Sequence, residues 1–159
     1  MPRRPRWSPA SSTALAQGLE TRELGALLAE FENTTADTIT ARGGRVVKLI
    51  GDEVLYTAPD EGAAAAIAFD LTRIHRAHPR LPDVRAGLAS GRVLLRDGDV
   101  FGPVVNLAAR AVKAAGPGEV VAPHGFGDAA AVRAESLGPQ RLKGLDQPVE
   151  LSCLIDPSD

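Results

Sequence analysis

RVVKLIGDEVLYT, at residues 45–57, contains two runs of strand-favouring residues separated by Gly51-Asp52. Val, Ile, Leu and Tyr suit strands, and a Gly-containing dipeptide between two such runs is typical of a tight β-hairpin. The segment therefore predicts strands 45–50 and 53–57. The sharp turn at Gly51 is expected to expose the Asp52 carboxylate at the hairpin tip.

Helices are predicted on both sides of this hairpin. Between Thr21 and Arg42, residues recurring at three- and four-residue steps form one stripe, namely Leu24, Leu27, Leu28, Phe31 and Thr35. Gly43-Gly44 ends this helix. After the hairpin, Asp60 is a candidate N-cap of a helix that ends at Pro79 and Pro82. The predicted buried face of that helix consists of Ala64, Ile67, Ala68, Leu71 and Ile74.

The C-terminal half predicts a second hairpin around Gly91, with strands in 84–90 and 92–95, followed by a polar loop at 96–99. Pro103 suits the first turn of a third helix over roughly 103–115. Short strands are predicted at 119–121 and 149–155. The order of helix, hairpin, helix, hairpin, helix and mixed β predicts an α+β fold with helices packed on one face of a sheet.

Length and composition favour one ordinary globular domain. The chain has 159 residues, 44% hydrophobic and 24% charged, with a net charge of −2 that gives no general attraction to nucleic acid or membrane. The single cysteine, Cys153, excludes an intrachain disulfide and is interpreted as a buried, unreactive thiol. Residues 1–12 are rich in Pro, Arg and Ser and predict an irregular arm. We expect no membrane span and no signal peptide, and hence a cytoplasmic location.

Some polar residues are candidates for phosphate and metal chemistry. The Asp52 carboxylate suits Mg²⁺, which proteins usually hold with one or two carboxylates plus substrate phosphates; ordinary turn chemistry is the alternative. Asn106 and Arg110 are four residues apart and share a face of the third predicted helix, where Arg can donate to phosphate oxygens. A solvent-exposed face, continued by Lys113, explains them equally well.

Two further groups carry weaker signals. Lys143 precedes Gly144 and can reach a triphosphate as a point charge, or it is a surface lysine. His75, His78 and His124 have no spacing typical of a metal site or a catalytic dyad, so no role is assigned to them.

Four blocks, in this order and spacing, resemble the catalytic domain of class III adenylate/guanylate cyclases, in the bacterial, mycobacterial-like adenylate cyclase form. They are GGRVVKLIGDEVL at 43–55, GDVFGPVVNLAARAV at 98–112, GPGEVVA at 116–122 and RLKGLDQPVEL at 141–151. The helical segment 13–32 also matches, so 13–159 is identified as a nucleotide cyclase homology domain. The resemblance implies a ferredoxin-like βαββαβ core with extra C-terminal elements. It also implies a head-to-tail homodimer with composite sites at the interface.

The resemblance further implies a reaction and its residues. ATP would be converted to cyclic AMP and pyrophosphate with two Mg²⁺ or Mn²⁺ ions, the 3′-hydroxyl attacking the α-phosphate. Asp52 resembles the second metal carboxylate. Lys48 and Asp99 match the pair that reads the base, and they favour adenine because Lys can donate to N1 and Asp can accept from the amino group. The remaining matches are Asn106 and Arg110 with the transition-state pair, and Lys143 with the terminal phosphates.

The front of the chain departs from the family pattern. The family begins with a strand that carries the first metal Asp, and alignment puts Ser8 there, followed by Pro9. A serine hydroxyl replaces a bridging carboxylate poorly, and proline cannot donate a ladder hydrogen bond, so the first strand is expected to be degenerate. An altered or misassigned gene start and a genuine degenerate cyclase both account for this.

Two functional hypotheses follow. One is an adenylate cyclase with weak or no activity in this chain. The other is a non-catalytic cyclase homologue that binds nucleotide or forms a heterodimer with an intact cyclase. In that role it would lend Lys48, Asp99, Asn106 and Arg110 to the partner's metal half-site.

Overall fold

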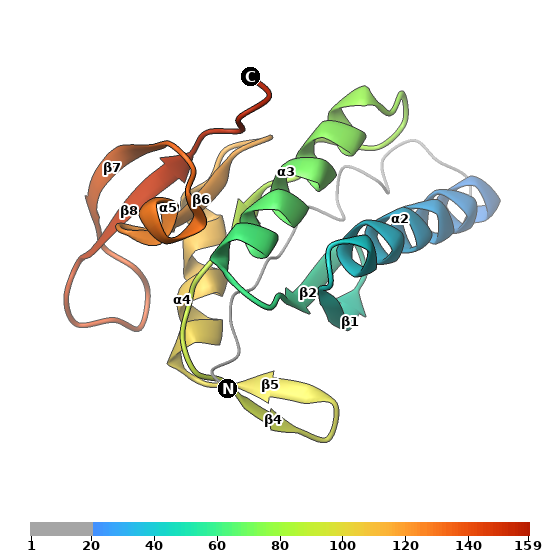
Figure 1. Cartoon of the computed structure of the whole chain (residues 1–159). Coiled ribbons are helices and arrows are strands. Elements are labelled where there is room, and N and C mark those ends of the chain that lie inside the picture. The colour runs from blue at the N-terminus through green and yellow to red at the C-terminus, as the bar shows by residue number, and fades with distance from the viewer. Residues whose placement is uncertain (1–20) are drawn as a thin grey trace.

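The computed structural model describes residues 21–159 (Figure 1). The predicted arm at 1–12, the degenerate first strand with Ser8 and the start of the homology domain lie outside these residues. The described elements are α2 (Thr21–Ala41), β1 (Arg45–Ile50), β2 (Glu53–Thr57), α3 (Glu61–Ala77), β3 (Ala86–Gly87), β4 (Leu94–Arg96), β5 (Asp99–Phe101), α4 (Pro103–Ala111), the 3₁₀ helix η1 (Val112–Ala114), β6 (Val120–Pro123), α5 (Phe126–Ala130), β7 (Ala134–Gln140) and β8 (Val149–Leu154).

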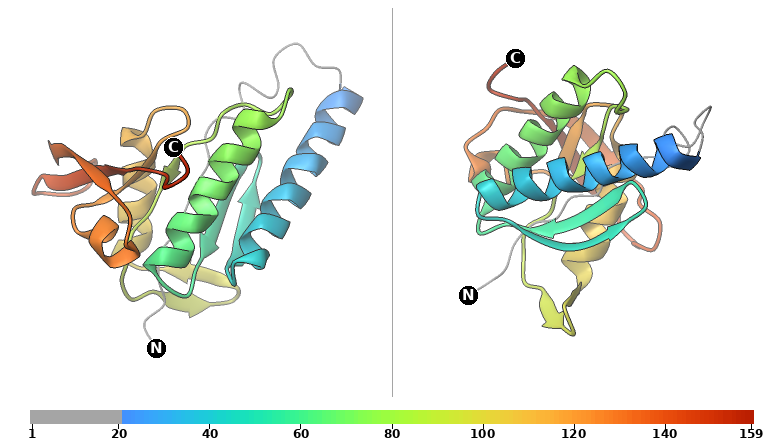
Figure 2. Two further views of the ribbon diagram at one scale, coloured as in Figure 1. Left: turned by 45° about the horizontal axis from the view of Figure 1, so that its top comes forward. Right: turned by 90° about the vertical axis from the view of Figure 1, so that its right-hand side faces the viewer.

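The predicted hairpin at 45–57 is confirmed. β1 and β2 pair antiparallel, with Ile50 opposite Glu53, so that the turn consists of Gly51 and Asp52. Gly51 has a φ of 59°, a left-handed conformation that glycine adopts at little cost. The two long helices α2 and α3 lie side by side over this hairpin (Figure 2).

A second, four-stranded sheet has the order β3-β6-β8-β7, in which β3 and β6 are parallel and the other pairs antiparallel. Helix α4 packs against β3 and β6. The approach is close at Gly87, where a Cβ atom would lie 2.4 Å from the Ala108 carbonyl oxygen and the Val112 nitrogen. Helices over sheets confirm the predicted α+β class.

The second predicted hairpin, around Gly91, is wrong. β3 ends at Gly87 and pairs with β6, whereas β4 pairs with β5 around Asp97-Gly98. Asp97 and Gly98 have φ angles of 51° and 76°, and positive φ at both central residues is what a two-residue hairpin loop of type I′ requires. The segment predicted as a polar loop is therefore the hairpin turn.

The helix predictions hold with two corrections, and a further correction concerns Cys153 on β8. Asp60 caps α3 as predicted, its carboxylate accepting from the Ala63 N–H at 2.7 Å. Ile74 does not lie on the buried face of α3, since it is 36% exposed. The third helix is α-helical only to Ala111, after which η1 tightens it. Cys153 is half-buried rather than buried; burial raises the pKa of its thiol, which keeps it unreactive at neutral pH.

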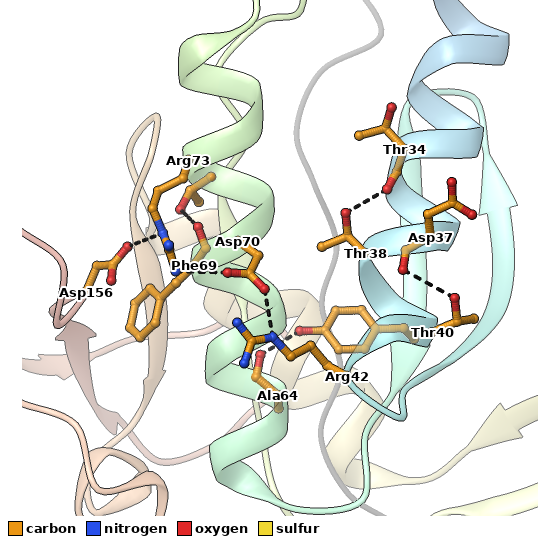
Figure 3. Close-up of polar contacts among 12 residues, drawn as sticks. Thr34, Asp37, Thr38, Thr40, Arg42, Ala64, Phe69, Asp70, Arg73 and Asp156 are labelled. Atoms are coloured by element: carbon orange, nitrogen blue, oxygen red, sulfur yellow. Dashed lines mark hydrogen bonds and ion pairs between the residues drawn. The ribbon is translucent and has the colours of Figure 1, made fainter.

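The main core lies between α3 and the sheets, and it includes Ile39, Tyr56, Ile67 and Leu71. Tyr56 donates its hydroxyl to the Ala64 carbonyl at 2.9 Å, which joins β2 to α3. On the surface, Asp70 of α3 pairs with Arg42 at the end of α2 (Figure 3). No helix in the described range 21–159 combines the length and the apolar character needed to cross a membrane.

Candidate functional site

Lys48 and Asp99 are brought together by the fold. Lys48 lies on β1 and Asp99 begins β5, and the Lys48 Nζ atom is 2.9 Å from Asp99 Oδ2. The two side chains are 43% and 32% exposed, so the pair faces solvent and a ligand can reach it. The other carboxylate oxygen of Asp99 accepts from the Val100 N–H at 2.7 Å, which fixes its orientation.

The Val100 N–H contact is part of the site that the sequence interpretation missed. It depends on the tight turn at Asp97-Gly98, which starts β5 at Asp99 and points the carboxylate back at the backbone. The signal for it was present in the Asp-Gly dipeptide, which is typical of type I′ hairpins.

Asp52 is not exposed as the sequence suggested. The residue is only 3% exposed, because side chains alternate along a strand and Asp52 shares the inward face with Val54 and Tyr56. Its Oδ2 atom is buried without a hydrogen-bond partner among the described residues. Burial raises the pKa of this carboxyl above its ordinary value.

A divalent cation fits this environment. A buried carboxylate without a partner is costly, and a cation beside it offsets that cost. No group of three His, Cys, Asp or Glu side chains in residues 21–159 could hold a metal alone. Asp52 therefore suits an ion that takes one or two carboxylates from the protein and its other ligands from phosphates and water, as Mg²⁺ does.

Asn106 and Arg110 both lie on α4, four residues apart, as predicted. Asn106 is exposed and Arg110 is half-buried, while Ala108 and Ala111 of the same helix are buried. The helix begins at Pro103 directly after β5, which carries Asp99. Asp99 and this helix therefore belong to one continuous stretch of chain, whereas Lys48 lies on β1.

Lys143 lies in the loop between β7 and β8. Its neighbour Leu142 is buried in a small core cluster with Val121 and Leu151, and the Leu145 N–H donates to the Leu142 carbonyl at 3.1 Å. This turn leaves Lys143 exposed. Among residues 21–159, no hydrogen bond or ion pair links Asp52 to Asn106, Arg110 or Lys143. Of the candidate residues within 21–159, only Lys48 and Asp99 are joined by an ion pair.

A cavity of about 620 Å³ lies elsewhere, beside α5, β7 and β8. It is lined by His124, Asp128, Arg133 and small residues, and it includes none of the candidate site residues.

No protein-family model matches the chain. An adenylate cyclase of Streptomyces coelicolor is 51% identical over 98 residues, covering 62% of this chain and 26% of that protein. An adenylate cyclase of Glutamicibacter nicotianae is 43% identical over 111 residues, covering 70% and 28%. An uncharacterized protein of Mycobacterium tuberculosis is 43% identical over 147 residues, covering 88% and 37%. The chain thus spans from 26% to 37% of the length of these relatives.

Solved structures share the fold. The adenylyl cyclase CyaB of Pseudomonas aeruginosa superposes with a TM-score of 0.81 at 20% identity, covering 97% of this chain and 95% of that one. The catalytic core of a rhodopsin-guanylyl cyclase with converted specificity, in complex with ATPαS, gives a TM-score of 0.85 at 19% identity, covering 96% and 94%. At such identities the superpositions establish the fold alone.

Proposed function

The chain belongs to the class III nucleotidyl cyclase catalytic-domain family, and on this premise we propose that it binds ATP and converts it to cyclic AMP and pyrophosphate as a head-to-tail dimer. In this reaction the ribose 3′-oxygen bonds to the α-phosphorus, the bond from that phosphorus to the β-phosphate oxygen breaks, and pyrophosphate leaves. The hydroxyl proton passes to solvent.

The observation that carries the proposal is the ion pair of Lys48 and Asp99. It joins two separate strands with N and O atoms 2.9 Å apart, at a position open to a ligand. An ammonium donor beside a carboxylate acceptor complements the N1 acceptor and the amino donor of adenine. These two residues would orient the base, so the proposed substrate is ATP rather than GTP.

Asp52 is proposed as the metal carboxylate. Its unpartnered Oδ2 atom and desolvated position favour a cation that arrives together with the triphosphate. Mg²⁺ or Mn²⁺, when bound, supplies positive charge that offsets the phosphate oxygens. Ser8 stands where the resemblance puts the other metal carboxylate, and for this reason we propose that activity is lower than in a cyclase with both.

Asn106 and Arg110 are proposed to act on the reacting phosphate from the neighbouring chain. The exposed face of α4 presents an amide and a guanidinium, and positioned donors of this kind stabilise charge that develops in a transition state. Lys143, exposed on its turn, would contact the terminal phosphates. The separation of these residues from Asp52 within one chain is what a composite site between two chains requires.

The test is conversion of ATP to cyclic AMP by the full chain with Mg²⁺ or Mn²⁺, together with ATP binding by calorimetry. We expect slow turnover and measurable binding, and we expect Lys48→Ala to weaken ATP binding by roughly tenfold or more. Arg96→Ala is the matched control. Arg96 is an exposed cation on the β4–β5 hairpin, which also carries Asp99, and its contact to Asp97 is a loose 3.7 Å. Equal loss in both variants would contradict base reading by Lys48.

The second candidate function is that of a non-catalytic homologue, favoured by Ser8, which stands where the resemblance puts the other metal carboxylate. Such a chain would lend its Lys48, Asp99, Asn106 and Arg110 to an intact cyclase. Mixing it with a related cyclase whose own Asn and Arg positions are substituted tests this idea. Heterodimers that form without any return of activity would rule out the lending role.

A further inference from the structure

Two histidines near the end of α3 hold the N-terminal half of α2, and the proposed function uses neither. His75 is buried, at 1% exposure, and its Nδ1 atom lies 3.2 Å from the Pro82 carbonyl oxygen. A carbonyl only accepts, so Nδ1 carries the proton. The Nε2 atom is buried and has no hydrogen-bond partner among the described residues. The ring meets Phe31 of α2 edge-on, with centroids 5.4 Å apart.

His78, which follows α3 as its C-cap, has the opposite tautomer. Its Nδ1 atom accepts from the backbone N–H groups of Arg80 and Leu81, both at 3.1 Å, and must therefore be unprotonated. Its Nε2 atom then carries the proton and donates to Glu30 of α2 at 2.7 Å. Arg80 adds a second contact to the Glu30 carboxylate at 3.3 Å. His78 thus ties the end of α3 to α2 through Glu30, whereas the buried His75 ring has an Nε2 atom with no partner among the described residues.

The rest of α2 is anchored differently from this half. At its C-terminal end, Ile39 belongs to the main core and Arg42 pairs with Asp70 at 2.8 Å. The N-terminal half rests on a small separate cluster of Leu27, Phe31 and Leu81. A helix segment held by a small cluster opens more easily than one in the main core.

We propose that His75 forms an acid-sensitive latch, which holds the N-terminal half of α2 in place at neutral pH and releases it on acidification. A proton on His75 Nε2 would place a charge and an unpartnered N–H in the core against Phe31. This release of α2 is a conformational change that does not require the proposed catalytic function.

The burial of His75 favours release of α2 at acidic rather than at alkaline pH. Burial lowers the pKa of His75 below its ordinary value of 6.5; the Pro82 contact and Asp83 oppose this shift, and His78 adds to it. The facing charged groups are Glu30 from α2, and Arg80 and Asp83 from the loop. With a lowered folded pKa, the closed state is fully stable above the ordinary value and loses stability as pH falls below it.

Opening of the latch would affect the strand that carries part of the candidate site. Leu49 of β1 packs against the same small cluster, and it lies next to Lys48. Release of α2 would therefore remove packing from the strand that carries the base-reading lysine.

The test measures the full chain by NMR and by hydrogen exchange. Long-range ¹H–¹⁵N spectra are expected to give the Nδ1–H tautomer for His75 and the Nε2–H tautomer for His78, with the pKa of His75 below its ordinary value of 6.5. Amide protection in residues 24–31 should fall between about pH 7.5 and about pH 5.5, after correction for intrinsic exchange. The fall should be about tenfold for each unit by which the His75 pKa is lowered, whereas residues 36–41 keep their protection.

Variants separate the latch from general acid sensitivity. His75→Asn keeps a donor near the Nδ1 position and does not titrate, so it is expected to flatten the pH response of residues 24–31. His124→Asn changes an exposed histidine far from α2 and should leave that response intact. If His75→Asn fails to fold, the proposal is tested by the His75 tautomer and by the amide protection of residues 24–31 in the unmodified chain. Protection in 24–31 that is independent of pH, or a full response in His75→Asn, overturns the proposal.

Discussion

Asp52 shows how one residue can be identified correctly by type while its environment is misjudged. The Gly-Asp turn predicts a carboxylate at a hairpin tip, and a carboxylate does occupy that position. Its side chain nevertheless points to the inward face. Side chains along this segment alternate between the two faces, and Asp52 falls on the same face as Val54 and Tyr56. The local pattern gives the turn, whereas burial depends on what packs against that face of the strand.

Asp52→Asn is expected to make the protein more stable while abolishing cyclic AMP formation. A neutral amide lacks the desolvation cost of the buried carboxylate, so the free energy of unfolding should rise by on the order of 1 kcal/mol at neutral pH. Because the pKa of Asp52 is raised in the folded state, this cost appears as pH rises through the ordinary value of 3.8 and is absent below it.

Urea unfolding at neutral and acidic pH measures this gain, which should disappear toward acid. Asp146→Asn, at an exposed loop position, is the matched control and should change neither stability nor activity. A destabilised Asp52→Asn chain would show that the carboxylate has a structural partner.

Lys48 and Asp99 should matter to ligand binding far more than to folding. Exposed ion pairs contribute from about 0 to 1 kcal/mol to stability, and both of these side chains are partly exposed. Asp99→Ala is therefore expected to lower the free energy of unfolding by less than about 1 kcal/mol while weakening ATP binding clearly. Thermal unfolding and calorimetry on the same sample test both parts, and a large loss of stability with unchanged binding would refute the base-reading role.

Among the elements, those with local signals were predictable and those that depend on distant pairing were not. The hairpin at 45–57 and the Asp60 cap each rest on residues a few positions apart. β3 pairs in parallel with β6, with Ala86 opposite Val120, although the β4–β5 hairpin and α4 lie between the two strands in the sequence. No nearby residue signals that partner, and so the segment was assigned to a hairpin with its nearest β-rich neighbour.

Helix α4 provides a test of how an element positions the site. Gly87→Ala would place a methyl group 2.4 Å from the backbone of α4 at Ala108 and Val112, so the helix must move away from β3. We expect a loss of about 1–3 kcal/mol in the free energy of unfolding and reduced activity, because Asn106 and Arg110 move with the helix.

Gly25→Ala is the control for that change. A Cβ atom at Gly25 meets nothing within 4 Å, and replacing glycine inside an exposed helix should stabilise α2 by about 1 kcal/mol. Chemical unfolding curves of the two variants should shift in opposite directions. An unchanged free energy of unfolding in Gly87→Ala would mean that α4 moves without cost and does not depend on this close approach.

At the scale of the whole molecule, the candidate site residues divide into groups that one chain does not join. The sequence resemblance named these residues and implied composite sites between two chains, and the fold places them on separate elements. Asp52 lies on the inward face of the β1–β2 turn, whereas Asn106 and Arg110 lie on α4 and Lys143 on the loop after β7. A symmetric dimer can bring the groups of two chains together twice, once at each of two equivalent sites.

Mixing two inactive variants tests this division directly. In an equal mixture of Asp52→Asn and Arg110→Ala chains, half of the dimers are mixed, and each mixed dimer has one site free of both substitutions. Activity should therefore return to about a quarter of that of the unmodified chain, although each variant alone is inactive. A mixture of Asn106→Ala and Arg110→Ala should recover nothing, because every site then contains one defect. No recovery in the first mixture would mean that Asp52 and α4 act within the same chain, whereas recovery in the second would mean that Asn106 and Arg110 do not serve the same site.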